Sequence, residues 1–137
     1  MLSTKPPLSF TARIIRGAGR GKRLGVPTIN LDLGPIPDEL PEGIYAVRVR
    51  FGEEEQFLEA VMHFGPRPVF QDSRSCEVHL LTGKSQIPNP KSQTLTVEVV
   101  KRLRDVRNFE DAGALKEQMA KDIAEAIFLL HSGRDAQ

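Results

Sequence analysis

Apolar and polar residues alternate along most of the chain, up to about residue 103, and beyond it apolar residues recur at helical spacing. Successive side chains on a strand point to opposite faces, so the first pattern predicts strands and the second an amphipathic helix. Alternation predicts five strands, at residues 8–14, 43–51, 56–64, 76–81 and 95–99. Pro27 favours extended geometry before it, which indicates a further short strand at 28–30. An acidic turn at 52–55 predicts a hairpin between its two flanking strands. Antiparallel strands with short links, followed by one helix, favour a small closed barrel, which has no exposed sheet edge.

The helix is expected to begin between Asn108 and Asp111, with Asn108 as a possible N-cap, and to end at Gly133. Its apolar stripe predicts contact with the core, through Leu115, Met119, Ile123, Ala126, Ile127 and Leu130. The charged residues between them predict a solvated face, made of Lys116, Glu117, Lys121, Asp122 and Glu125. Loops are expected at 34–41 and 83–93.

Composition predicts one soluble domain spanning residues 1–137. Cys76 is the only cysteine, so no disulfide can form within the chain, and a reducing, cytoplasmic setting fits best. No apolar run is long enough to span a membrane, and the N-terminus has no apolar signal core. With three scattered histidines, a structural zinc site has no support.

The net charge of +1 conceals an asymmetry along the chain. No acidic residue precedes Asp32, whereas six basic residues do, so the rest of the chain carries −5. The six are Lys5, Arg13, Arg16, Arg20, Lys22 and Arg23. A nucleic-acid partner usually calls for a more basic chain with exposed aromatic residues, so a small phosphorylated ligand fits this balance better.

A glycine-rich basic loop precedes the short strand at 28–30. The loop carries Gly17, Gly19, Gly21 and Gly25 together with Arg20, Lys22 and Arg23. Glycines let the backbone bring several N–H groups close to an anion, and the basic side chains add charge. Thr28 and Asn30 share one face of the strand, and two neutral oxygens suit a Mg²⁺ ion that a nucleotide brings with it. The segment predicts a phosphate and metal site, with an ordinary solvated turn as the alternative.

Two generic phosphate motifs are absent. A Walker loop needs four residues between its glycine and Gly-Lys, whereas Gly17 and Gly21 are separated by three, and Lys22 is followed by arginine. The Gly-x-Gly-x-x-Gly spacing of dinucleotide-binding folds is also missing.

Glu77 is the candidate general base, because it is a lone carboxylate within an otherwise apolar strand, and His79 shares its face. If this face lines the mouth of a barrel, partial burial would raise the proton affinity of the carboxylate. The alternative is that both side chains point to solvent. A phosphate loop, a metal pair and a base together favour a kinase with an unidentified acceptor.

The order of these elements resembles the riboflavin kinase family over about residues 8–131. The blocks that carry the resemblance are the glycine loop at 17–25, Val-Pro-Thr-Ile-Asn at 26–30, Glu-Gly-Ile-Tyr at 42–45, Gly-Pro-Arg-Pro-Val-Phe at 65–70, Glu-Val-His-Leu-Leu at 77–81, Leu-Arg at 103–104, Asn-Phe at 108–109 and the helix at 115–126. The resemblance implies a six-stranded Greek-key barrel packed by a C-terminal helix. It also implies a stand-alone domain that corresponds to the C-terminal half of bacterial bifunctional enzymes.

The resemblance further implies a reaction and its residues. ATP and riboflavin would give FMN and ADP, with Gly17, Gly19, Gly21 and Lys22 binding the ATP phosphates. Thr28 and Asn30 would hold Mg²⁺, Glu77 would accept the proton of the terminal ribityl hydroxyl, and Arg104 and Phe109 would contact the flavin. Riboflavin and ATP would be the only partners of a monomeric, cytoplasmic enzyme that touches neither membrane nor nucleic acid.

The clearest departure from the family pattern is the segment 82–91, which replaces an acidic turn and a tyrosine. It motivates one alternative, a flavin- or nucleotide-binding module without turnover. The basic N-terminal segment motivates another, a barrel that binds nucleic acid.

Overall fold

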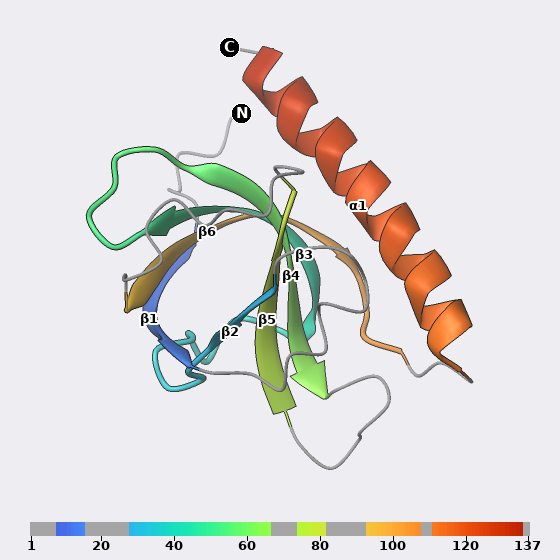
Figure 1. Ribbon diagram of the computed structural model, residues 1–137, viewed down its shortest axis with the longest axis horizontal. Helices are drawn as coiled ribbons and strands as arrows, with labels where there is room; N and C mark the ends of the chain where they lie inside the picture. The colour runs from blue at the N-terminus through green and yellow to red at the C-terminus, as the bar shows by residue number, and fades with distance from the viewer. Residues whose placement is uncertain (1–7, 16–27, 67–73, 82–92, 108–110, 136–137) are drawn as a thin grey trace.

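A computed structural model describes residues 8–15, 28–66, 74–81, 93–107 and 111–135, and in this part six strands precede one helix (Figure 1). The strands are β1 Ser9–Ile15, β2 Thr28–Leu31, β3 Gly43–Phe51, β4 Leu58–Pro66, β5 Arg74–Leu80 and β6 Thr94–Arg104, and the helix is α1 Ala112–Asp135. The predicted strands are confirmed, and β6 extends five residues beyond the predicted end at 99. Residues 34–41 form turns, as expected.

The six strands form a closed barrel in the order β1-β2-β5-β4-β3-β6, and every neighbouring pair is antiparallel. The predicted hairpin is present, with Val49 opposite Leu58 at its turn end. β1 pairs with both β2 and β6, which closes the sheet and leaves no open edge. The predicted fold class is therefore confirmed as an antiparallel six-stranded barrel with one C-terminal helix.

Alternate residues of every strand fill the barrel interior. The interior cluster includes Ile29, Leu31, Val47, Val49, Phe51, Met62, Phe64, Cys76, Val78, Leu80, Leu95 and Val97. Burial of each Val or Leu side chain contributes about 1.5–3 kcal/mol, so this cluster is the principal apolar contribution to stability. It also fixes which residues point outward, since a side chain next to an interior residue on the same strand faces the outer wall.

Helix α1 packs on the outer wall of the barrel, across β3, β4 and β6 (Figure 1). A second apolar cluster forms this contact and includes Ile44, Ala46 and Val61 of the barrel with Ala126 and Leu130 of the helix. None of the helices in the described ranges is long and apolar enough to cross a membrane.

The ends of α1 differ from the prediction. Asp111 is the N-cap, because its Oδ1 accepts a hydrogen bond from the Ala114 N–H at 2.8 Å, and the helix begins at Ala112. The helix continues through Gly133 to Asp135, so the predicted end at Gly133 is wrong. A glycine within a helix costs about 1 kcal/mol relative to alanine but does not by itself end the helix.

Two residues of the helix lie on a different face from the one predicted. Ile127, expected in the core stripe, is 37% exposed. Asp122, expected on the solvated face, is only 3% exposed. Ala126 and Leu130 of the predicted stripe are confirmed in the core, and Asp122 lies beside them on the face turned toward the barrel.

Candidate functional site

A row of side chains crosses five strands on the outer wall of the barrel. The strand register places Asn30 opposite Glu77, Glu77 opposite His63, His63 opposite Ile44, and Ile44 opposite Arg104. Side chains directly opposite each other in an antiparallel sheet share a face and have Cβ atoms about 4.5–5.5 Å apart. We call these five residues the outer row.

The outer row lies on the wall of the barrel and not at its mouth. Ile29, Met62 and Val78 alternate with members of the row along their strands and belong to the interior cluster. The Glu77 side chain is nevertheless 27% exposed, so it is partly buried without lining the barrel interior. Glu77 is therefore partly buried on the outer wall and does not line the barrel interior.

Thr28 and His79 form the next pair on the same face, two residues along β2 and β5 from Asn30 and Glu77. Thr28 Oγ1 and His79 Nδ1 are 3.0 Å apart and hydrogen-bonded. Burial lowers the pKa of His79 to about 4, so its ring is neutral at pH 7. The alternative that His79 points to solvent is wrong, because its side chain is 3% exposed.

The tautomer of His79 follows from its second nitrogen. His79 Nε2 lies 3.9 Å from Glu77 Oε1, and since the ring is neutral, this contact is not an ion pair. A nearby carboxylate favours the proton on Nε2, which leaves Nδ1 as an acceptor for the Thr28 hydroxyl. A hydroxyl that donates its hydrogen keeps lone pairs that can bind a cation.

The donor set of this region fits a hard cation. Thr28 and Asn30 are both partly exposed and present oxygen atoms from one face of β2. In the described ranges there is no group of three His, Cys, Asp or Glu residues that could hold a metal ion. Two neutral oxygens therefore fit an ion whose remaining ligands are waters and substrate phosphates, as Mg²⁺ commonly has.

Arg104, at the far end of the outer row, is held by the helix. Its Nε and Nη2 donate to the two carboxylate oxygens of Asp122, at 2.9 and 2.8 Å. Gln118 Nε2 donates to Asp122 Oδ1 at 3.1 Å. This two-point pair joins the end of β6 to the first half of α1.

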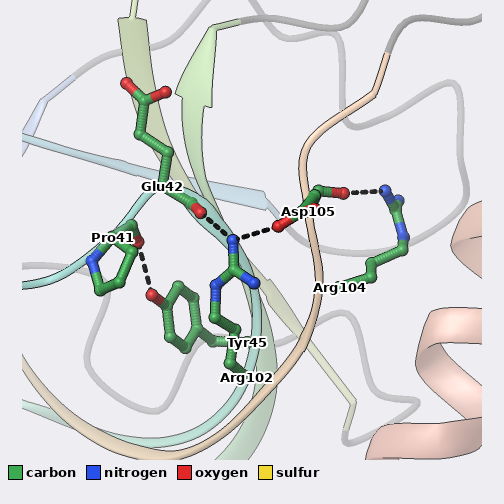
Figure 2. A network of polar contacts seen from close by, with 6 residues as sticks. All are labelled: Pro41, Glu42, Tyr45, Arg102, Arg104 and Asp105. Atoms are coloured by element: carbon green, nitrogen blue, oxygen red, sulfur yellow. Dashed lines mark hydrogen bonds and ion pairs between the residues drawn. The ribbon is translucent and has the colours of Figure 1, made fainter.

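A second set of polar contacts joins Arg104 and Arg102 to Asp105 (Figure 2). Arg104 Nη1 donates to the main-chain oxygen of Asp105 at 2.9 Å, and Arg102 Nη2 donates to Asp105 Oδ1 at 2.6 Å. Arg102 Nη2 also donates to the main-chain oxygen of Glu42, which connects the end of β6 to the residue before β3. The flavin contact suggested for Arg104 stays a prediction.

The structure thus brings Thr28, Asn30 and Glu77 together and places Arg104 in the same row. The predicted phosphate residues Gly17, Gly19, Gly21 and Lys22 lie outside the described residues, as does Phe109. Sequence reasoning missed two further residues here, His63 and Asp122. His63 lies between two apolar residues of a predicted strand, which could have drawn attention to it. Asp122 lies four residues before Ala126, so the two share one face of the helix, and this spacing could have indicated that Asp122 is near the core.

Comparison with known proteins adds the family. The sequence model of the flavokinase family, described as riboflavin kinase, matches residues 4–130. Bifunctional riboflavin kinase/FMN adenylyltransferases are 33% identical over 121 residues in Buchnera aphidicola, 32% over 125 in Bacillus subtilis and 31% over 117 in Escherichia coli. These alignments cover 85%, 88% and 85% of this chain, but only 37%, 38% and 36% of the relatives.

A solved structure supports the same fold. It is described as a macrolide-efflux protein from Streptococcus pneumoniae and matches with a TM-score of 0.66 and 25% sequence identity. The match covers 85% of this chain and 37% of that one.

Proposed function

The chain belongs to the riboflavin kinase family, and on that premise we propose that it transfers the γ-phosphate of ATP to the terminal ribityl hydroxyl of riboflavin, giving FMN and ADP. The observation that carries the proposal is the register of β2 and β5, which makes Asn30 the partner of Glu77 and Thr28 the partner of His79. A base and two oxygen ligands on adjacent strands are what a metal-dependent phosphoryl transfer needs.

In the proposed reaction, Glu77 accepts the proton of the attacking hydroxyl. Its carboxylate is partly exposed, so a substrate can reach it, and it has the neutral rings of His79 and His63 as neighbours on its own strand and on β4. A neutral imidazole forms no ion pair with the carboxylate, so neither histidine competes with the substrate as a charged partner of Glu77.

Thr28 and Asn30 would hold the Mg²⁺ of the nucleotide. When bound, the ion supplies positive charge that offsets the charge developing on the transferred phosphoryl group. The hydrogen bond to His79 fixes the direction of the Thr28 hydroxyl. We assign the other contacts by family resemblance, with Gly17, Gly19, Gly21 and Lys22 at the phosphates and Arg104 and Phe109 at the flavin.

We also propose that residues 1–137 work as one monomeric, cytoplasmic domain. Cys76 is the only cysteine of the chain, so no disulfide within it is needed, and its thiol is buried in the barrel interior, where burial raises its pKa to about 12.

The proposal is tested by incubating the purified protein with riboflavin, ATP and Mg²⁺ and separating the flavins by chromatography. A parallel titration with riboflavin alone measures binding without turnover. FMN formation supports the kinase. Riboflavin binding without FMN would refute the proposed turnover and favour the silent binding module.

A further inference from the structure

His63 is a buried histidine that nothing in the described part of the chain satisfies. The residue is 8% exposed, and neither ring nitrogen has a hydrogen-bond partner there. Buried polar groups in native proteins are nearly always paired, and an unpaired one destabilises the fold. A group kept in this state calls for a partner that the described residues do not supply.

The neighbours of His63 show where that partner would bind. On the outer wall, His63 is flanked by Ile44 and Glu77 on the adjacent strands, and by Val61 and Gly65 along β4. Ile44 and Val61 belong to the apolar cluster under the helix, and Gly65 has no side chain. The polar neighbour in the row is therefore Glu77, the candidate base.

The charge state of His63 restricts the chemistry of its partner. Burial lowers the pKa of His63 to about 4, and Arg104 lowers it further. A contact with the residue's own main chain, whose geometry is too poor for a hydrogen bond, and the charges of Asp122 and Glu42 raise it. Arg104 and Asp122 are bound to each other, and His79 is also neutral, so the carboxylates of Glu77 and Glu42 are the other charged groups near His63. A neutral imidazole offers one donor and one acceptor. This pattern matches a hydroxyl group and offers no charge to a phosphate.

We propose that His63 binds a hydroxyl group of the phosphate acceptor beside the Glu77 carboxylate. The inference rests on the proposed function, in which the acceptor carries a polyhydroxyl chain. One ring nitrogen donates to a hydroxyl oxygen and the other accepts a hydroxyl hydrogen, and no proton leaves the ring. His63 thus orients the chain so that one hydroxyl faces Glu77.

Two substitutions of similar volume separate this role from a structural one. His63→Leu removes both polar atoms, whereas His63→Gln keeps a donor and an acceptor. We expect His63→Leu to weaken riboflavin binding about tenfold and His63→Gln to change it by less than about threefold, since a lost hydrogen bond leaves a substrate hydroxyl unpaired. ATP binding should be unchanged in both, and the exposed His131→Leu serves as the matched control.

Thermal unfolding provides the second measurement. His63→Leu removes two unsatisfied buried atoms, so its melting temperature should equal or exceed that of the wild type while its riboflavin affinity falls. If this variant does not fold, His63→Phe replaces it and keeps the ring.

The outcomes separate this inference from the proposed function. A wild-type protein that forms FMN, with riboflavin affinity equal in the wild type, His63→Leu and His63→Gln, would overturn the role of His63 alone. A wild-type protein that neither binds riboflavin nor forms FMN would overturn both.

Discussion

Substitution of Asp122 should reveal how strongly the helix is held to the barrel. The Arg104–Asp122 pair is two-point, and its side chains are 18% and 4% exposed. Asp122→Asn keeps the size of the side chain but leaves the Arg104 guanidinium without its carboxylate. Breaking a buried pair from one side typically costs 3–5 kcal/mol, and we expect about 3 kcal/mol, because Arg104 keeps its bond to the Asp105 main chain.

Asp105→Asn is the matched control, because it removes a carboxylate from a pair of similar length on the surface. The Arg102–Asp105 pair spans 2.6 Å, but the Asp105 side chain is 85% exposed, so its loss should cost less than about 1 kcal/mol. Both free energies of unfolding are measured by urea denaturation at pH 7, with unchanged slopes required for the comparison.

A double variant completes this test. Arg104→Met combined with Asp122→Leu removes both charges, and it should be more stable than Asp122→Asn alone, since no charge is left without its partner. The reasoning would be refuted if Asp122→Asn cost no more than Asp105→Asn, or if the double variant were the least stable of the set.

Three further predictions concern the site and its histidines. Glu77→Gln should retain flavin and nucleotide binding but lose most turnover, because a carboxamide cannot accept the proton; equal turnover in a steady-state assay would remove Glu77 from the base role. Asn30→Ala should raise the Mg²⁺ concentration needed for half-maximal activity, and a Mg²⁺ titration that matches the wild type would argue against Asn30 as a ligand. The pKa values of His63 and His79 are lowered to about 4 from 6.5, so the unfolded state binds more protons and the protein loses stability as pH falls from about 6.5 to 4. In urea denaturation series, His63→Leu should reduce this slope by about 1.4 kcal/mol per pH unit, and an identical slope would contradict the neutral buried state of His63.

The barrel was predictable because its strands obey a simple alternation. Cys76, Val78 and Leu80 alternate with Glu77 and His79, and the structure places the first three in the interior and the other two outside. The pattern did not indicate which strands pair, since β2 pairs with β5 although β3 and β4 lie between them in the sequence. The opposition of Asn30 and Glu77 depends on that pairing.

The helix shows where local pattern fails. Asp122 looks like a surface residue because charged residues surround it in the sequence, yet its partner Arg104 is 18 positions away and comes from a strand. A buried ion pair has no signature in one segment alone, since its free energy depends on two residues that meet only in the fold. His63 was overlooked for the same reason, because its position beside Glu77 follows from register.

The kinase activity is tested by measuring FMN and ADP together in one reaction with riboflavin, ATP and Mg²⁺. We expect equal amounts of FMN and ADP from the wild type and far less of both from Glu77→Gln. ADP without FMN, or no product from a folded wild-type protein, would contradict it.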